Sequence, residues 1–380
     1  MKFPVLGWIL KGILTLLVAA ASLVLLVQPL RTLFFAEKED TGAATELGHF
    51  DLSAAAVELL NGCREGMLES ALSVPKVYWL LDEDVIAPEP DRSCYSYYTN
   101  AADMGGFLEA AQGILDGQQT LFHTGITLQP GTTATCYLDE TLMAITWKEV
   151  VEGSAATITE IKLRHPSQFR RYLTEDTYGS RVMKHTTAMG SFVNAVVACA
   201  GDFHYNRPMG LVVYDGTVWR EEDALVDTCH INGAGDLLFT YAGQFSNKEE
   251  AQNYVDQQGV RFSISFGPVL VDQGKAVEGL AGYLIGQVND RYSRAMLCQM
   301  GPLHYVVVTI NMEGNFRKVM NIHQLQALAV RWGAVNAYTL DGGQTGTISM
   351  DGKLYNRPDW GEQKYISDIF YFATAVPDGS

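Results

Sequence analysis

The stretch from Asn336 to Met350 reads NAYTLDGGQTGTISM, in which a glycine-rich polar loop joins two apolar runs. The apolar run that ends at Leu340 predicts a buried strand, and a second apolar run follows the small and polar residues. Gly342 and Gly343 allow the backbone to turn sharply and to approach a ligand closely. A loop of this kind at a strand end often carries function. A plain connection between two strands is the alternative interpretation.

The surrounding sequence predicts an α+β fold, with a mixed β-sheet domain and interleaved helices over residues 132–380. Short β-rich runs dominate from about Thr132 onward. Residues 322–332 place apolar side chains on one broad face and end at a glycine, which predicts a helix. Asp215-Gly216 and Asp351-Gly352 each lie between apolar-rich arms, so we expect tight hairpin turns there rather than catalytic aspartates.

The N-terminal residues 1–35 predict a transmembrane anchor with a short cytoplasmic N-terminus. Residues 12–30 carry no charge and are long enough for a helix to cross a bilayer. Lys2 and Lys11 precede this run, which favours a single-pass protein of the cell membrane whose C-terminal domain is extracytoplasmic. A cleaved signal peptide, with small residues at 19–22, is the competing interpretation.

Residues 36–131 predict a stalk and a helical accessory segment. Residues 36–50 are small and polar, and helical spacing of apolar residues follows over 51–72. Prolines then interrupt the pattern, and a second helix is expected over about 101–115. This segment is interpreted either as a lid or as a spacer that holds the main domain away from the membrane.

Composition excludes some classes of function. The formal net charge of −16 over 380 residues argues against a nucleic-acid binder, because no excess of basic residues is available to displace counterions from phosphates. None of the six cysteines forms a close CxxC pair, which argues against a zinc site. A disulfide stays open, although Cys199 lies in an apolar run and is expected to be a small core residue.

Three charged residues follow or precede apolar runs in a similar way. Asp202 follows one apolar run, Asp341 follows another, and Arg294 comes just before a third. Two carboxyl groups and an arginine suit hydrolysis of a sugar that is bound to a phosphate. A phosphate leaving group is a weak base, so it benefits more from a bidentate arginine than from a general acid. Buried salt bridges would use the same residue types.

Residues 161–376 resemble the phosphodiester glycosidase family, in its bacterial, membrane-anchored, exopolysaccharide-related branch. The matching segments occur in the family's order. They are LRHPSQFR (163–170), AVVACAGDFHYNR (195–207), MGLVVYDGTVWRE (209–221), SFGPVLV (265–271), RYSRAMLCQMGPLHYVVV (291–308), NAYTLDGGQTGTISMDGKLYNRP (336–358) and SDIFYFATAV (367–376). The combination of LDGGQT with NRP is the most specific part of the match.

The resemblance implies an enzyme that hydrolyses a sugar-1-phosphodiester and releases the sugar and a phosphomonoester. By motif position it implies catalytic roles for Asp341, Asp202 and Arg294, with Arg294 on the phosphate and the two carboxylates sharing the remaining work. The implied substrate-binding residues are Gly342, Gly343, Thr345, Gln344, Phe203 and Gln299. His185 and His204 lie near the motifs and are expected to be structural more often than functional.

Two departures from the family pattern keep a second function open. Ala200 stands where the family usually has asparagine, and Cys298 stands where glycine is common. The leading hypothesis is therefore a hydrolase of envelope or exopolysaccharide glycans, and the alternative is a glycan-binding or envelope-assembly protein that does not cleave. Carboxylates and glycine-loop carbonyls also suit a divalent cation such as calcium, although no EF-hand-like run is present.

Overall fold

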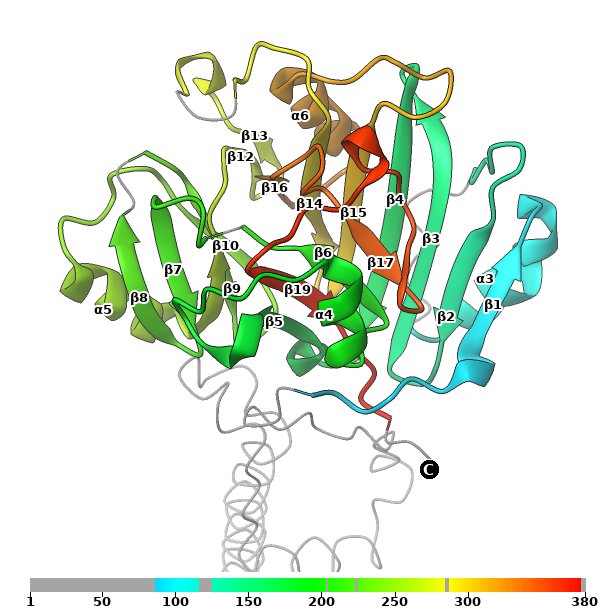
Figure 1. Cartoon of the computed structure of the whole chain (residues 1–380), viewed down its shortest axis with the longest axis horizontal. Helices are drawn as coiled ribbons and strands as arrows, with labels where there is room; N and C mark the ends of the chain where they lie inside the picture. The colour runs from blue at the N-terminus through cyan, green and yellow to red at the C-terminus, as the bar shows by residue number, and fades with distance from the viewer. Residues whose placement is uncertain (1–85, 116–124, 203, 223–224, 284–286, 377–380) are drawn as a thin grey trace, which may run out of the picture. The chain divides into compact units, whose positions relative to one another are not determined.

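The computed structural model describes residues 86–115, 125–202, 204–222, 225–283 and 287–376 (Figure 1). The predicted anchor at 12–30 and the predicted helix at 51–72 lie outside these residues. Within the described ranges, no helix is both long and apolar enough to cross a membrane.

The largest sheet of the described chain has nine strands, and its order in space differs from its order in sequence. The strands, in spatial order, are β1 (Tyr95–Tyr98), β2 (Ala134–Leu138), β3 (Leu142–Val151), β4 (Ser154–Leu163), β15 (His304–Asn311), β14 (Arg294–Gly301), β16 (Asn336–Leu340), β12 (Val269–Asp272) and β13 (Lys275–Ala276). Its central strands are buried on both faces, which explains why they read as nearly continuous apolar runs.

Three smaller sheets complete the strand pairing of the described residues. The five-stranded sheet contains, in order, β18 (Lys353–Leu354), β17 (Ile348–Met350), β6 (Val197–Ala200), β19 (Asp368–Phe372) and β5 (Phe169–Leu173). The three-stranded sheet contains β10 (Leu237–Thr240), β9 (Thr228–Asn232) and β11 (Val260–Ile264), and the two-stranded sheet contains β7 (Gly210–Tyr214) and β8 (Thr217–Glu222).

Four α-helices are described, and they are short. They are α3 (Gly105–Ala111), α4 (Thr186–Phe192), α5 (Lys248–Gln258) and α6 (Ile322–Arg331). Helix α6 begins with a capping box, in which the Asn321 and Gln324 side chains each accept a hydrogen bond from the other's backbone N–H. Helix α5 ends at Gly259, whose left-handed conformation closes the last turn.

The fold is a sheet-dominated mixture of strands and few helices, as the sequence predicted in outline. Helix α6 and the hairpin turns at Asp215-Gly216 and Asp351-Gly352 are confirmed, and all four turn residues have positive φ. The sheets are less mixed than expected. Every pair of named strands is antiparallel, and the parallel contact found among the described residues is an isolated bridge between Ser154 and Lys318.

The segment that the sequence analysis assigned to a separate accessory region shares the main sheet. Strand β1 pairs with β2, and side chains of α3 such as Phe107 pack in the same core as α6. The helix expected over 101–115 is shorter than predicted, with a 3-10 turn at Ala101–Met104 followed by α3. The pairing was not visible in the sequence because the YSYY of β1 has no apolar alternation.

Two apolar cores lie on opposite faces of the nine-stranded sheet. One core lies between that sheet and helices α3 and α6, with Trp147 and Leu325 among its members. The other lies between that sheet and the five- and three-stranded sheets, with Phe169 and Tyr305 among its members. Helix α4 covers the outer face of the five-stranded sheet, as Figure 1 also shows. The fold is therefore layered, with helices on the outside and two sheets packed face to face.

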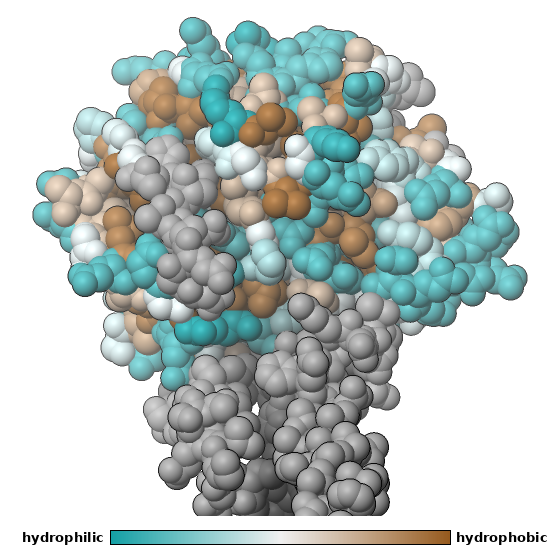
Figure 2. Space-filling view, turned by 180° about the vertical axis from the view of Figure 1, so that it is seen from behind, coloured by the Kyte–Doolittle hydropathy of each residue, from teal (hydrophilic) through white to brown (hydrophobic). Residues whose placement is uncertain are grey.

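Outside these cores, polar and apolar side chains share the surface. Figure 2 shows the face opposite to that of Figure 1, where hydrophobic side chains occur in several separate groups among hydrophilic ones. The five described cysteines are free thiols, and all except Cys94 are buried. Cys199 lies in the core between the two large sheets, as its apolar surroundings predicted. Burial raises the pKa of its thiol.

Phe169 is central to the core between the sheets. Its ring is fully buried and lies against four other aromatic rings, those of Phe262, Tyr305, Phe370 and Phe372. We expect Phe169→Ala to lower the free energy of unfolding by about 3–5 kcal/mol, because it leaves a cavity between two sheets. Chemical denaturation measures this change. The control Phe316→Ala, at a partly exposed ring, should change it by less than about 0.5 kcal/mol.

Candidate functional site

Residues from four strands meet at one edge of the two large sheets. Ala295 of β14 pairs with Leu340 of β16, so Arg294 and Asp341 occupy adjacent positions at this edge. In the five-stranded sheet, the Ala200 amide at the end of β6 donates to the Thr347 carbonyl at 3.3 Å, just before β17 begins. The structure therefore brings the ends of β16 and β6 together with the start of β14 and β17.

The DGG loop, residues 341–347, is the connection from one large sheet to the other. It leaves β16 of the nine-stranded sheet and enters β17 of the five-stranded sheet. Gly342 lies against the backbone of Ser293, where a Cβ would overlap the Ser293 carbonyl oxygen. Asn356 fixes the other end of the loop, since its Nδ2 donates to the Gly346 carbonyl at 2.7 Å and its Oδ1 accepts from the Ile348 amide at 2.9 Å.

Asp341 is the loop residue whose electrostatic surroundings are most unusual. Burial raises the pKa of its carboxyl above the ordinary value, and Arg207, the Thr345 hydroxyl and Lys364 oppose that rise. The net shift is upward, so desolvation outweighs the nearby positive charge. A carboxyl in contact with solvent is a stronger base when its pKa is raised, which suits it to proton transfer.

Arg207 is the positively charged residue that lowers the pKa of Asp341 most. Its guanidinium carbon lies 4.1 Å from the centroid of the Phe266 ring. Its Nη1 is buried and finds no hydrogen-bond partner among the described residues. Arg220 holds the preceding loop in place by donating to the carbonyls of His204, Met209 and Gly210 at 2.7–2.9 Å. A fixed guanidinium with an unused buried N–H is a ready partner for an anion.

Arg294 has a different set of contacts from those expected of a phosphate ligand. Its Nη2 donates to the backbone carbonyls of Gln287 at 3.0 Å and Asp290 at 2.9 Å, and its Nε donates to Met320 at 3.3 Å. Burial lowers the pKa of its guanidinium, while Tyr292, Asp290 and Asp341 act in the opposite direction. These contacts order the segment before β14. Arg294 therefore supports the backbone at Ser293, against which Gly342 of the DGG loop packs.

Asp202 belongs to a buried charge cluster made of Arg171, Asp202, His204 and Asp368. Arg171 Nη2 donates to Asp202 Oδ1 at 2.9 Å and to Asp368 Oδ2 at 2.8 Å, and its Nη1 donates to the Ser263 carbonyl. The other Asp202 oxygen accepts from the Ser265 amide at 3.0 Å. With 1% of its surface exposed, Asp202 is placed to hold loops together rather than to meet a substrate directly.

The electrostatics of the charge cluster follow from this geometry. Burial by itself would raise the pKa of Asp368, but Arg171 and His204 outweigh it and hold that pKa well below the ordinary value. Burial by itself would lower the pKa of Arg171. Asp202 and Asp368 outweigh this effect, so the pKa of Arg171 is raised. The segment after β11 connects the cluster to Arg207. The Ser265 amide donates to Asp202, and the Arg207 guanidinium packs over the ring of the next residue, Phe266.

A metal fits the charge cluster poorly. Asp202, His204 and Asp368 each offer one ligand atom within 4.8 Å of the others. Calcium takes six to eight oxygen ligands, however, and this set has one histidine and two carboxylates. Arg171 already places a positive charge on both carboxylates. These residues do not favour the calcium ion that the sequence analysis allowed for.

The remaining predicted residues of the DGG loop serve through backbone and hydroxyl groups. The Thr345 hydroxyl interacts with Asp341, and the Gln344 carbonyl accepts from the Lys364 amide at 3.3 Å. Gly343 has φ of 68°, and its carbonyl accepts from the Asp359 amide at 3.3 Å. Phe203 lies outside the described residues.

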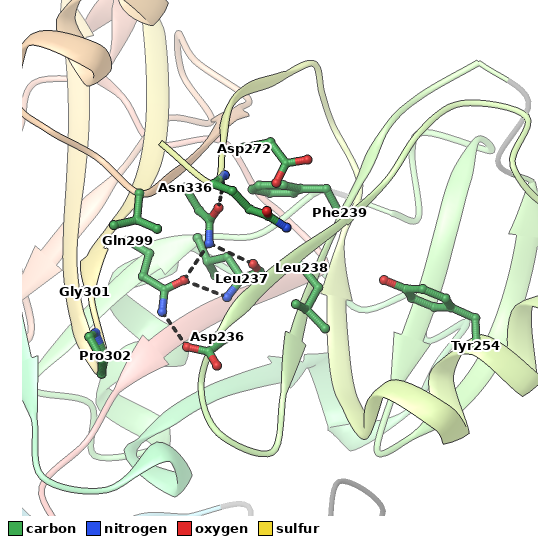
Figure 3. Close-up of a pocket in the computed structure, with 12 residues that line it drawn as sticks. Asp236, Leu237, Leu238, Phe239, Tyr254, Asp272, Gln299, Gly301, Pro302 and Asn336 are labelled. Carbon is green, nitrogen blue, oxygen red and sulfur yellow. Dashed lines mark hydrogen bonds between the residues drawn. The ribbon is translucent and has the colours of Figure 1, made fainter. Parts of the chain in front are cut away.

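Gln299 lies at the other end of β14 from Arg294. Its side chain accepts from the Leu237 amide and from Asn336 Nδ2, both at 3.0 Å, and donates to Asp236 at 2.8 Å (Figure 3). These groups border a separate cavity of about 480 Å³. The sequence motif grouped Gln299 with Arg294, but five residues of extended strand separate them by roughly 17 Å.

The two departures from the family pattern lie in the apolar cores. Ala200 is buried with Met189 and Val193 under helix α4. Cys298 is fully buried in the core beneath helix α6. In this chain both side chains fill space in the apolar cores. His185 lies before helix α4, with its ring 4.1 Å from that of Tyr365.

Four residues of the site were not singled out from the sequence, namely Arg171, Arg207, Lys364 and Asp368. Arg171 directly follows the LRHPSQFR segment, Arg207 ends the FHYNR segment and Asp368 begins the last strand. A charged residue inside an otherwise apolar β-strand pattern, as in RRYL or SDIFYF, was the available signal. Lys364 lies in a polar loop and gave none.

Comparison with known proteins agrees with the motif-based resemblance. Residues 192–373, just under half of the chain, match the model of the phosphodiester glycosidase family, which confirms the resemblance over that range. The SPbeta prophage-derived uncharacterized protein YomE of Bacillus subtilis (strain 168) is 24% identical over 200 residues, which are 51% of this chain and 30% of YomE. The chain thus spans about a third of the length of this curated relative.

Two solved structures are similar to part of this chain, at low sequence identity. The catalytic domain of zebrafish N-acetylglucosamine-1-phosphodiester alpha-N-acetylglucosaminidase, auto-inhibited by its pro-peptide, has a TM-score of 0.47 and 15% identity, over 61% of this chain and 82% of that one. A hypothetical protein from Synechocystis has a TM-score of 0.45 and 14% identity, over 64% of each chain.

The packing of Gly342 against Ser293 predicts a strong steric effect. Gly342→Ala should displace the DGG loop and lower the melting temperature by several degrees, because the Cβ has no space beside the Ser293 carbonyl. Gly301→Ala is the matched control, since a Cβ at Gly301 meets nothing within 4 Å. Equal melting temperatures for the two variants would contradict this account of the loop.

The charge cluster predicts a pH-dependent loss of stability. Asp368→Asn should cost about 3–5 kcal/mol near neutral pH, because Arg171 loses a buried partner. The lowered pKa of Asp368 means that its contribution is present above the ordinary value of 3.8 and is lost as the pH falls. The difference between the two proteins should therefore begin to shrink only below pH 3.8, and denaturation from pH 7 to pH 2 should show the two proteins converging. Glu152→Gln, in an exposed pair with Arg331, should cost less than about 1 kcal/mol throughout.

Proposed function

We propose, from the match of residues 192–373 to the phosphodiester glycosidase family, that this chain hydrolyses sugar-1-phosphodiester linkages in glycans. The observation that carries the proposal is the electrostatic effect of Arg207 on Asp341. A guanidinium with a buried, unpartnered N–H acts on a carboxyl group whose pKa is raised by burial. An anion-binding group and a proton-transfer group are the two things that this reaction needs.

In this proposal Arg207 binds the phosphate. The unused Nη1 donates a charge-assisted hydrogen bond to a phosphate oxygen, and the Phe266 ring limits the directions in which the guanidinium can turn. Lys364, which acts electrostatically on Asp341 and is more exposed, adds positive charge on the same side. The phosphate role therefore moves from Arg294, whose donors bind backbone carbonyls, to Arg207.

Asp341 acts as the general base in this scheme. Its carboxylate takes a proton from a water molecule as the water oxygen forms a bond to the anomeric carbon. The bond from that carbon to the phosphate oxygen breaks, and its electron pair stays on the phosphate. The proton then leaves Asp341 for the phosphomonoester or solvent. A phosphate is a good leaving group, so the reaction needs little help from a second acid.

Arg294 and Asp202 act as positioning residues in the proposal. Arg294 holds the segment that supports Gly342, and Asp202 ties the loop before Arg207 to Arg171 and Ser265. Both roles affect the reaction through the geometry of the groups that touch the substrate.

The setting of the reaction is also a proposal. The uncharged run at 12–30 supports a membrane-anchored protein whose C-terminal domain acts outside the cytoplasm on envelope or exopolysaccharide glycans. The alternative is a protein that binds such glycans and does not cleave them. It is favoured by Ala200, because a buried alanine cannot supply the hydrogen bonds that the family's usual asparagine offers.

Sugar release from a GlcNAc-1-phosphate methyl diester and from UDP-GlcNAc tests the proposal. We expect the wild type to release sugar, and Asp341→Asn to reduce kcat about 100- to 10,000-fold. The wild-type rate should rise with pH through the raised pKa of Asp341, because the base must be ionised. Melting temperature at neutral pH should not fall in Asp341→Asn, since ionising a buried carboxyl costs stability above its ordinary pKa.

Asp272→Asn provides the matched control, because Asp272 borders the separate cavity near Gln299. It should leave sugar release within about twofold of the wild type. Equal activity of Asp341→Asn and Asp272→Asn would overturn the assignment of Asp341. Binding of both compounds by a wild type that never releases sugar would support the non-cleaving alternative.

A further inference from the structure

The cavity beside Gln299 lies between the edge strand β10 and the ends of β12 and β16 (Figure 3). Its volume of about 480 Å³ is in the range of small-ligand sites, which is roughly 300–1,000 Å³. It is at the opposite end of β14 from Arg294, and none of the residues assigned above to hydrolysis line it. The cavity is therefore separate from the candidate site, and its chemistry can be considered independently.

The amide side chains that border the cavity use their donors mainly within the protein. Asn336 Nδ2 donates to the Leu237 carbonyl at 3.1 Å and to Gln299 Oε1 at 3.0 Å. Gln299 Nε2 donates to Asp236 Oδ1 at 2.8 Å. These bonds fix the wall of the cavity, and they leave the carboxylates as the main polar groups available to a ligand.

Two carboxylates supply the charge of the cavity. Asp236 and Asp272 line it, and the described residues that line it include no lysine or arginine. Asp236 Oδ1 accepts from Gln299, and Asp272 Oδ2 accepts from the Tyr241 hydroxyl at 2.9 Å, so each carboxylate retains a second oxygen. Figure 3 shows the two carboxylates on opposite sides of the bonded Gln299 and Asn336 side chains. Such a cavity repels a phosphate ester and attracts an ammonium or guanidinium group.

Strand β10 also presents backbone groups to the cavity. Alternate residues of an antiparallel strand direct their N–H and C=O groups away from the partner strand. Leu237 does so, because its amide donates to Gln299 and its carbonyl accepts from Asn336. Phe239 follows two residues later, so its N–H and C=O also point away from β9, and no other described residue hydrogen-bonds to them. An open strand edge of this kind can pair with a further extended segment.

We propose that this cavity binds a short basic segment of a peptide. The peptide backbone pairs with Phe239, and a lysine or arginine side chain is attracted by the carboxylates of Asp236 and Asp272. The Leu238 and Phe239 side chains line the cavity and offer apolar surface to the aliphatic stem of that side chain. The net charge of −16 favours encounter with a basic partner.

The paired stretch is short, because the Gln299 and Asn336 side chains already occupy the backbone groups of Leu237. The partner is therefore recognised by one or two residues and their charge rather than by a long strand. This inference does not rest on the proposed hydrolase activity, since the two sites share no residue.

Two capped tripeptides test the inference with the full chain. They are acetyl-alanyl-lysyl-alanine amide and the same peptide with norleucine in place of lysine, which keeps the aliphatic stem and removes the ammonium group. Ligand-observed NMR titration measures the affinities. We expect the wild type to bind the lysine peptide at least about tenfold more tightly than the norleucine peptide. The double variant Asp236→Asn with Asp272→Asn should lose that preference.

Hydrogen exchange provides a second measurement, directed at the strand edge. Exchange in residues 237–240 should slow with the lysine peptide, because the Phe239 N–H gains a partner. The double variant should stay folded, since asparagine oxygens can still accept from Gln299 and from the Tyr241 hydroxyl. Glu109→Gln, at an exposed carboxylate of α3, is the matched control and should change neither affinity.

Equal affinities of the wild type for the two peptides, or no binding of either, would overturn the inference whether or not the double variant is stable. Unchanged exchange in residues 237–240 would overturn the pairing with β10. Tighter binding of methyl glucoside than of the lysine peptide would instead assign the cavity to a neutral sugar. Sugar release by the double variant should stay within about twofold of the wild type, so failure of the hydrolase proposal would be seen separately.

Discussion

Arg171 donates hydrogen bonds to Asp202, to Asp368 and to the carbonyl of Ser263, and these three partners come from different parts of the chain. Strand β5 carries the arginine, β19 and β11 carry two partners, and Asp202 follows β6. A buried guanidinium is tolerated only if its charge and its donors are satisfied, so its partners are constrained in position as well as in type. The loops that leave these strands therefore begin from fixed points.

The buried charges around Arg171 also determine the position of the Arg207 guanidinium. Asp202 binds the Ser265 amide, which fixes the segment that presents the Phe266 ring to Arg207. Gly201 is part of the same arrangement, because a Cβ there would overlap the Asp368 carboxylate. The chain thus uses buried charges to build the frame and leaves one arginine N–H without a partner at its edge. That division separates groups that support the site from groups that can meet a substrate.

The DGG loop adds a second constraint of a steric kind. It must pass from one sheet to the other while lying against the backbone at Ser293, and Gly342 is the residue that makes the approach feasible. Asp341 is therefore held at the junction of the sheets, where burial raises the pKa of its carboxyl. The Asp359 amide binds the Gly343 carbonyl of the same loop, and the next residue, Trp360, has a left-handed backbone conformation.

Much of the local structure was determined by the sequence itself. Helix α6 follows from its apolar spacing and its glycine stop, and the turns at Asp215-Gly216 and Asp351-Gly352 follow from the left-handed conformations that these residues accept. The proximity of Asp341 to Arg294 was also predictable, because both belong to motifs at strand ends. These features depend on neighbours within a few residues, or on motifs whose order was visible in the chain.

Only the tertiary structure decided which charged residues do what. Asp202 and Arg294 were expected to meet the substrate, yet their hydrogen-bonding groups are engaged by Arg171, Ser265 and backbone carbonyls. Gln299 shares a strand with Arg294 but lies at its other end. The sequence could not reveal this, because the role of a charge depends on desolvation and on partners brought from 30 to 200 residues away. Residue type and motif order indicated where the candidate site lies, and long-range packing determined the hydrogen-bond partners of its charged residues.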